Sequence, residues 1–240
     1  MRQRPSESSS SRSLPRVFLP GANPSEPIDL PKEEQDKLHK VLRLPEGALV
    51  AVLPNDGTLI RCEYRARQAI PIGVERPNTE PSLRITLAQA LPKGDRAETI
   101  IRMGTELGVA KFVLFSAERS IVRWEPAKVN EKLRRYRTIA REAAEQSYRA
   151  RLPELEIMAS LVDVLSAWPE ATVLSEVEGI AKYLQKTGEE MTIVIGPEGG
   201  WAPRELRLIG DRGVTMGPLV LRTDTAGLAA SAALLLGARV

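Results

Sequence analysis

From residue 83 onward, short apolar runs alternate with longer amphipathic segments, and this alternation limits the possible folds more than any other feature of the chain. The first units are a strand over residues 83–90, a helix over 95–107 that ends at Gly108, and a strand over 110–115. Such succession is typical of a largely parallel sheet. We therefore predict an α/β fold for residues 83–240.

The rest of this region continues the pattern. Strands are predicted around residues 155–157 and over 171–174, 191–195 and 214–217. Helices are predicted over residues 127–149, 161–168, 180–187, 203–212 and 226–238.

Residues 16–75 have a different pattern, with several short strands and one helix. The strands are predicted over residues 16–19, 49–53, 58–66 and 69–74, and Asp56-Gly57 marks a hairpin turn. The helix is predicted over residues 31–42, with Leu38, Val41 and Leu42 on one face. We interpret this region as a small barrel-like β domain that acts as a binding module.

Two segments lack periodic apolar residues. Residues 1–15 are rich in Ser and Arg, and we expect a disordered tail. Residues 76–82 are polar and contain two prolines, so we predict an interdomain linker there.

Composition excludes several classes of chemistry. The 240-residue chain has one cysteine, Cys62, and one histidine, His39, which excludes an internal disulfide framework, a Cys/His zinc cluster and most His-based triads. No run reaches the roughly 18 apolar residues of a membrane span, and the N-terminus lacks the apolar segment of a secretory signal. We expect a cytoplasmic protein.

Charge is uneven along the chain although the net charge is only +3. Residues 128–151 contain eight cations and three anions, an excess of five. This excess suits a polyanion such as nucleic acid, and it is equally typical of a solvated helix face.

Two glycine-containing loops follow predicted strands, at residues 196–200 and 217–226. Loops at the carboxyl ends of strands bind ligands because their backbone amides are free. Neither a G-x-G-x-x-G motif after the first strand nor a G-x-x-x-x-G-K-[ST] motif occurs, which argues against a Rossmann or P-loop site. Asp224 or Thr225 can cap the last helix, whereas Arg222 in an apolar and hydroxyl run needs an anionic partner.

Six segments together resemble the RsmE family of S-adenosyl-L-methionine (SAM)-dependent methyltransferases, which methylate N3 of a uridine in small-subunit ribosomal RNA. They are LPKGD (91–95), TELGV (105–109), SAERS (116–120), EAAEQS (142–147), IGPEGG (195–200) and LRTDTA (221–226). The segment HKVLR (39–43) also resembles the family.

The resemblance implies a PUA-like RNA-binding domain at residues 16–75 and a SPOUT domain at 83–240 with a C-terminal trefoil knot. It also implies a homodimer that acts on small-subunit ribosomal RNA, with the 30S subunit as the expected context. Cofactor contacts carried over by motif are Leu174, Ser175, Gly196, Pro197, Gly200, Met216, Gly217, Leu219, Leu221, Arg222, Thr225 and Ala226. The family usually has Glu in place of Asp224 and a small residue in place of Tyr148.

Methylation at N3 requires a uracil anion and a proton acceptor. We predict that Arg222 and Arg149, from different subunits, stabilise the anion, and that Glu145, Asp224 or a water accepts the proton. His39 is a weaker candidate for this role. With an RNA substrate implied, the basic helix favours RNA contact, and we assign RNA binding to Arg43, Arg134, Arg135 and Arg141. Two alternatives are a related SPOUT enzyme that modifies tRNA or a ribose hydroxyl, and a noncatalytic RNA-binding assembly factor.

Overall fold

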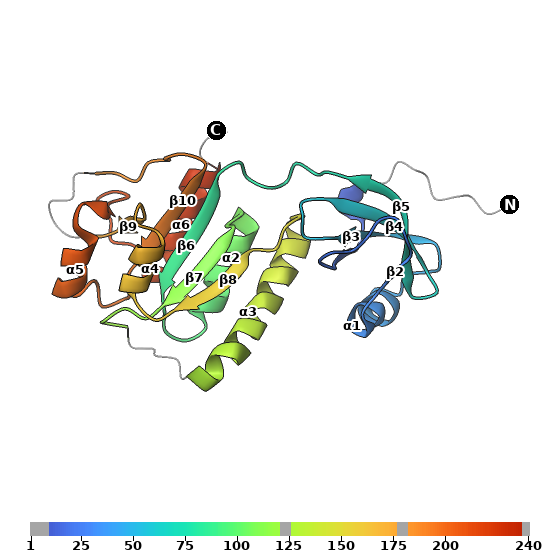
Figure 1. The fold of residues 1–240 in the computed structure, drawn as a ribbon, viewed down its shortest axis with the longest axis horizontal. Coiled ribbons are helices and arrows are strands. Elements are labelled where there is room, and N and C mark those ends of the chain that lie inside the picture. Colours follow the sequence, from blue (N-terminus) through green and yellow to red (C-terminus); the bar gives the residue numbers. More distant parts are fainter. Residues whose placement is uncertain (1–9, 121–125, 177–181, 237–240) are drawn as a thin grey trace. The chain divides into compact units, whose positions relative to one another are not determined.

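The computed structural model describes residues 10–120, 126–176 and 182–236, which form two compact units (Figure 1). The N-terminal unit comprises Met1–Glu80 together with Ala144–Arg151. The C-terminal unit comprises Pro81–Ala143 and Leu152–Val240. Among the described residues, no helix is both long and apolar enough to cross a membrane.

The N-terminal unit contains a five-stranded curled sheet in the order β1-β3-β4-β5-β2. β1 pairs with β3 in parallel, and the other neighbours are antiparallel. The four predicted strands are confirmed, whereas β2 has two residues, too few for an alternating pattern to show. The strands are β1 (Arg16–Phe18), β2 (Ile28–Asp29), β3 (Ala48–Leu53), β4 (Leu59–Arg65) and β5 (Gln68–Glu75).

The predicted hairpin joins β3 to β4. Asn55 and Gly57 have φ angles of 70° and 91°, and Asp56 Oδ1 accepts hydrogen bonds from the Thr58 amide at 2.8 Å and the Thr58 hydroxyl at 2.6 Å. The sheet buries Val50, Val52, Ile60, Cys62 and Tyr64 in its core. Of the predicted tail, residues 1–9 lie outside the described residues, and Ser11–Ser13 form a 3-10 turn.

The predicted helix over residues 31–42 is irregular. It consists of α1 (Lys32–Asp36) and a π-helical turn over Lys37–Val41. Leu38 is buried, but Val41 and Leu42 are 73% and 45% exposed, so the three residues predicted to share one face differ in burial. A π turn holds more residues than an α turn, so the residues after Leu38 rotate away from the core.

The long basic helix is confirmed as α3 (Pro126–Gln146), which ends three residues earlier than predicted. Tyr148 takes a left-handed conformation with φ 62°, which turns the chain. The segment Ala144–Arg151, from the last turn of α3 onward, belongs to the N-terminal unit. There the Glu80 carboxylate accepts hydrogen bonds from Arg149 Nη2 at 2.8 Å and from the amides of Ala150 and Arg151 at 2.9 and 3.1 Å.

The C-terminal unit is built on a six-stranded sheet in which every neighbouring pair is parallel, so the predicted α/β fold is confirmed. The strand order is β11-β9-β10-β6-β7-β8. These strands are β6 (Arg84–Ala90), β7 (Lys111–Phe115), β8 (Glu154–Met158), β9 (Thr172–Leu174), β10 (Glu190–Ile195) and β11 (Gly213–Val214).

Helices cover both faces of this sheet and enclose two apolar cores (Figure 1). On one face, Ile85, Leu87 and Ile193 pack with residues of α2 (Arg96–Leu107), α3 and α6 (Thr223–Leu236). On the other face, Ala88 and Val194 pack with residues of α4 (Leu161–Ala167) and α5 (Pro203–Ile209). This alternation along each strand is what a doubly covered parallel sheet requires.

The strand order reverses beside β6. β7 and β8 lie on one side of it, and β10, β9 and β11 lie on the other. In open parallel sheets, ligands bind at the carboxyl ends of the strands where the order reverses. Both glycine-containing loops predicted from the sequence follow strands on the β10 side, after β10 and β11.

One predicted helix was wrong. Residues 182–187 are extended, and residues 177–181 lie outside the described residues. Tyr183 pairs with Thr215 in a parallel bridge, and the Leu184 amide donates to the Thr215 carbonyl at 2.9 Å. The apolar spacing in this segment reflects strand-like pairing beside β11. The last helix, α6, begins at Thr223, three residues before its predicted start.

Candidate functional site

A cavity of about 280 Å³ lies at the carboxyl ends of β9 and β10, and we call it the site cavity. Its walls come from the loops after these strands, from α5 and from the start of α6. The lining residues are Leu174, Ser175, Glu176, Ile195, Gly196, Pro197, Gly200, Trp201, Leu206, Leu221, Thr223 and Ala226.

The loop after β10 depends on glycine at two positions. A Cβ atom on Gly196 would lie 2.9 Å from Cε2 of Trp201, and Gly200 has a φ angle of 68°. The Trp201 indole is itself fixed, because it stacks on Phe115 with ring centroids 6.5 Å apart and its Nε1 donates to the Leu174 carbonyl at 3.2 Å. The backbone of Gly196 therefore lines the cavity where no side chain fits.

The first turn of α6 forms the opposite wall. The Thr223 hydroxyl donates to the Gly196 carbonyl at 3.3 Å and so connects the two walls. One turn later, a Cβ on Gly227 would lie 3.1 Å from Gln89 Oε1, so this glycine allows the helix to approach β6 closely. The N-terminus of α6 thus faces the cavity, where it favours a negative group.

Hydrogen bonds hold the glycine loop to its neighbours. Glu205, on α5, accepts from the amides of Glu118 at 2.9 Å and Ala202 at 3.0 Å. Arg119 Nη1 donates to the Gly199 carbonyl at 3.2 Å. The loop after β7 and the loop after β10 are therefore fastened together, which gives the cavity a preformed wall.

The lining fits an adenosyl group better than a metal. Leu174, Leu221 and Ala226 supply apolar contact, and the buried Ser175 hydroxyl has no hydrogen-bond partner among the described residues. An unpaired buried hydroxyl is costly unless a ligand or water satisfies it. Among the described residues, no group of three or more His, Cys, Asp or Glu side chains is placed to bind a metal ion.

Seven of the twelve predicted cofactor residues line the site cavity: Leu174, Ser175, Gly196, Pro197, Gly200, Leu221 and Ala226. Met216 lines a separate hollow of about 360 Å³ beside Tyr183 and Leu184. The other four predicted residues, Gly217, Leu219, Arg222 and Thr225, are not among the residues that line the site cavity, and Leu219 is 77% exposed.

Five lining residues were not predicted as site residues: Glu176, Ile195, Trp201, Leu206 and Thr223. Two of them carry a local signal, because Ile195 ends an apolar run and Trp201 is an aromatic residue directly after Gly199-Gly200. Leu206 reaches the cavity from α5, and that contact depends on how the helix packs.

Two predicted catalytic residues belong to the N-terminal unit and have partners there. Arg149 is 4% exposed, and its Nε and Nη2 donate to Glu80 Oε2 at 3.2 and 2.8 Å. Glu145 Oε2 accepts from Lys37 Nζ at 2.5 Å. Their catalytic roles stay predictions. Tyr148 lies under the Arg16 guanidinium, whose Cζ is 5.0 Å from its ring centre.

The predicted RNA-binding arginines differ in how free they are. Arg43 is exposed in a left-handed conformation with φ 50°, and Arg134 is exposed on α3. Arg135 is already engaged, because its Nε and Nη2 contact the Glu98 carboxylate at 2.7 and 2.8 Å. Arg141 is half-buried. The RNA-binding assignments stay predictions.

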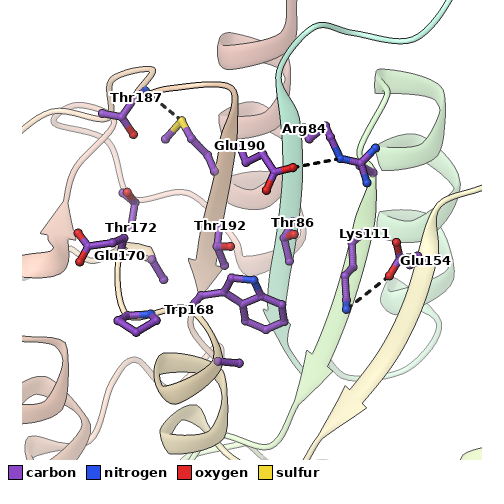
Figure 2. A pocket seen from close by; sticks show the side chains of 15 residues that line it. Arg84, Thr86, Lys111, Glu154, Trp168, Glu170, Thr172, Thr187, Glu190 and Thr192 are labelled. Atoms are coloured by element: carbon purple, nitrogen blue, oxygen red, sulfur yellow. Dashed lines mark hydrogen bonds and ion pairs between the residues drawn. The ribbon is translucent and has the colours of Figure 1, made fainter.

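A larger cavity of about 490 Å³ lies at the amino ends of the same strands (Figure 2). Thr192, Thr86, Lys111 and Glu154 occupy one register row across four adjacent strands and form part of its lining. This polar row lies on the same sheet face as Ala88, Val113 and Val194, which pack with α4 and α5, two helices of seven residues each.

Charged side chains at the amino edge pair with one another. Arg84 Nε lies 3.6 Å from Glu190 Oε1, and Lys111 Nζ lies 3.5 Å from Glu154 Oε2, as Figure 2 shows. Lys111 Nζ also lies 5.3 Å from the centre of the Trp168 ring. The site cavity is smaller, but it has the glycine loop, a helix N-terminus and the unpaired Ser175 hydroxyl, so we assign the candidate functional site there.

The cysteine offers no alternative chemistry. Cys62 is buried in the curled sheet, and burial raises the pKa of its thiol to about 12. A thiol with this pKa stays protonated at neutral pH and is a poor nucleophile.

Comparison with known proteins places this geometry in context. Residues 79–235 match a family described as an RNA methyltransferase domain. The ribosomal RNA small subunit methyltransferase E of Bacillus subtilis is 34% identical over 222 residues, which cover 84% of this chain and 87% of that protein. The Mycobacterium tuberculosis protein of the same name is 36% identical over 206 residues, 79% of each chain.

Solved structures agree with these relatives. A methyltransferase from Legionella pneumophila with bound SAM has a TM-score of 0.84 and 28% identity, over 94% of this chain and 98% of that one. The ribosomal RNA small subunit methyltransferase E of Neisseria gonorrhoeae, bound to SAM, has a TM-score of 0.81 and 27% identity, over 92% and 96% of the two chains.

Proposed function

Since the chain belongs to the ribosomal RNA small subunit methyltransferase E family, we propose that it transfers a methyl group from SAM to N3 of a uridine in small-subunit ribosomal RNA. The observation that carries this proposal is the site cavity, where a glycine loop and the first turn of α6 face each other at the carboxyl ends of β9 and β10. SAM-bound relatives with the same fold support it.

The residues that would hold SAM are those of the site cavity. Leu174 and Leu221 offer apolar contact to the adenosyl group, and Ser175 Oγ offers a hydrogen bond. The N-terminus of α6 favours the cofactor's carboxylate. When bound, SAM supplies an electrophilic methyl group, so the protein has to provide alignment and manage the proton of uracil N3.

The protein's own contribution is electrostatic. A uracil that loses its N3 proton carries negative charge on O2 and O4, and Arg222 and Arg149 are our candidates to stabilise it. Glu145 stays our first candidate for the proton acceptor. Asp224 is the alternative, because its buried Oδ1 has no hydrogen-bond partner within residues 10–120, 126–176 and 182–236, whereas Glu145 accepts from Lys37.

We further propose the arrangement that the family resemblance implies. It comprises a PUA-like domain at residues 16–75, a linker at 76–82, and a SPOUT domain at 83–240 whose C-terminal segment forms a trefoil knot. The enzyme would act as a cytoplasmic homodimer on ribosomal RNA within the 30S subunit. The curled sheet of the N-terminal unit and the fully parallel sheet of the C-terminal unit are compatible with this proposal.

The test is methyl transfer from labelled SAM to undermethylated small subunits and to their purified RNA, followed by mass spectrometry of the nucleosides. N3-methyluridine is the expected product. A methylated ribose, or modification of tRNA alone, would instead indicate a related enzyme with another target. If calorimetry finds RNA binding but no SAM binding, the protein is a noncatalytic RNA-binding factor.

RNA contact by α3 can be tested separately. Replacing Arg134, Arg135 and Arg141 together by Gln should weaken RNA binding and lower the slope of log affinity against log salt by about two to three, since each lost phosphate contact removes about 0.9. The expected change is about two if Arg135 stays paired with Glu98 and contacts no phosphate. A control with Arg84, Arg204 and Arg207 changed to Gln, three exposed arginines outside α3, has the same net charge. An equal slope in both variants would contradict the assignment.

A further inference from the structure

Arg96, the first residue of α2, lies between two acidic side chains, one in the glycine loop and one in the first turn of α6, and these two segments line opposite walls of the site cavity. Its Nη1 lies 3.3 Å from Glu198 Oε1, and its Nε lies 4.0 Å from Asp224 Oδ2. Arg96 itself is not among the residues that line the cavity. It therefore has the geometry to act on the cavity through its neighbours.

Glu198 connects Arg96 to the glycine loop. It lies between Pro197 and Gly200, both of which line the cavity, and its Oε1 also accepts the Lys93 amide at 3.1 Å. The carboxylate is thus held by two donors, one from α2 and one from the loop before it. A hydrogen bond between charged groups is stronger than a neutral one and fixes the geometry of its partners.

Asp224 connects Arg96 to α6, but weakly. It follows Thr223, which lines the cavity, and its distance of 4.0 Å from Arg96 is at the outer limit of an ion pair. Its other oxygen, Oδ1, is buried and has no hydrogen-bond partner among the residues that the structure describes. A glutamate at this position would extend the carboxylate by about one carbon–carbon bond, or 1.5 Å. The shorter side chain leaves the α6 side of this link loose.

We infer that Arg96 is a positioning residue, which holds the glycine loop and the first turn of α6 at the separation that the cofactor requires. Glu198 provides the strong link and Asp224 the weak one. This inference rests on the proposed function for the identity of the ligand, but the link between the two walls is a property of the protein alone. It can therefore be tested with and without SAM.

Calorimetry on the full chain tests how Arg96 affects SAM binding. Arg96→Gln should raise the Kd for SAM about tenfold. The KM for SAM should rise by the same factor while kcat at saturating SAM changes less than about twofold, because a positioning residue does not touch the reacting atoms. Arg96→Lys should restore part of the affinity, since lysine retains the charge but cannot contact Glu198 and Asp224 with two different nitrogens. The matched control is Arg84→Gln, which removes an arginine paired with Glu190 at the opposite edge of the sheet.

Double variants test the two links. The Arg96→Gln/Glu198→Gln variant should bind SAM no more weakly than Arg96→Gln alone, because both substitutions remove the same contact between residues 96 and 198. Asp224→Glu should tighten SAM binding about two- to threefold with Arg96 present and give no gain with Gln at residue 96. The inference would be overturned if the effects on SAM affinity were additive in both the Arg96/Glu198 and the Arg96/Asp224 pairs. It would also be overturned if Arg84→Gln lost as much SAM affinity as Arg96→Gln.

Hydrogen exchange without ligand separates this inference from the proposed function. In Arg96→Gln, amides in residues 196–200 and 223–226 should exchange faster, while those of β7 and β8 keep their rates. If the wild-type protein does not bind SAM, the proposed function fails, and the exchange result still decides whether Arg96 links the walls. Unchanged exchange in both segments would reject the link even if SAM binds.

Discussion

The parallel sheet has one cavity at the amino ends of its strands, which we call the amino edge, and one at the carboxyl ends, the carboxyl edge. The two cavities differ in whether their polar groups are paired. At the amino edge, the cavity of about 490 Å³ is lined by charged side chains paired with each other, such as Arg84 with Glu190. At the carboxyl edge, the cavity of about 280 Å³ is lined mainly by backbone and apolar groups, with Glu176 as its one acidic side chain, and the buried Ser175 hydroxyl has no hydrogen-bond partner in the part of the chain that the structure describes. The smaller cavity is therefore the better candidate for a ligand-binding site.

The two cavities also differ in how their walls are built. The larger one lies on the sheet face that packs with α4 and α5, two helices of seven residues each. Thr86, Thr192 and Lys111 are compatible with water there. At the carboxyl edge, hydrogen bonds from Thr223, Trp201 and Arg119 hold the loops in place. The volume of a cavity therefore says less about function than the unsatisfied groups in its walls.

The largest effect should follow a change at Gly196. In Gly196→Ala, the new Cβ would lie 2.9 Å from the Trp201 ring, which Phe115 and the Leu174 carbonyl hold in place. Overpacking of this kind costs about 1–3 kcal/mol, and such a cost in the bound state corresponds to about ten- to hundredfold in SAM affinity. Calorimetry measures the loss of SAM affinity, and thermal unfolding measures the loss of stability.

The control for Gly196→Ala is Thr192→Val, a near-isosteric change in the cavity at the other edge. We expect SAM affinity to stay within about twofold of wild type in this variant. If Thr192→Val also removes SAM binding, the distinction between the two edges is wrong.

A smaller effect is expected for Ser175→Ala, which removes the unpaired hydroxyl. Without ligand, the free energy of unfolding should change by less than about 0.5 kcal/mol, because the hydroxyl makes no hydrogen bond to the described residues. SAM affinity should fall about two- to tenfold, the equivalent of one hydrogen bond. A large loss of stability with unchanged SAM affinity would give Ser175 a structural role instead.

The smallest effect on SAM is expected for Lys111→Met at the amino edge, where affinity should not change. Burial lowers the pKa of Lys111, but its bonds to Glu156 and Glu154 outweigh burial and raise it. Because the folded pKa lies above the unfolded one, the ion pairs stabilise the fold at neutral pH, and this contribution disappears as the pH rises through the folded pKa. The variant should therefore lose at most about 1 kcal/mol near pH 7.

Chemical denaturation at several pH values measures this. The difference in stability between wild type and Lys111→Met should shrink once the pH exceeds the unfolded lysine value of about 10.4. A difference that grows with pH would show that Lys111 acts through something other than these carboxylates.

Local patterns were enough to predict most of the fold. The alternation of apolar strands and amphipathic helices after residue 83 predicted the parallel sheet, and Asp56-Gly57 predicted the hairpin, because both depend on neighbours in the chain. The glycine loop at residues 196–200 was likewise visible as a ligand loop, and three of its glycine and proline positions line the site cavity.

Contacts between residues far apart in the chain decided the rest. The apolar spacing of residues 182–187 suggested a helix, but pairing of Tyr183 with Thr215 makes the segment extended. Arg149 and Glu145 were predicted from their charge, and only the folded N-terminal unit supplies Glu80 and Lys37 as their partners. Likewise, Arg96 carried no local signal, because Glu198 and Asp224 become its neighbours only when β6, β10 and α6 assemble. The sequence by itself determined the elements and the family, whereas tertiary structure decided which charges and cavity walls meet.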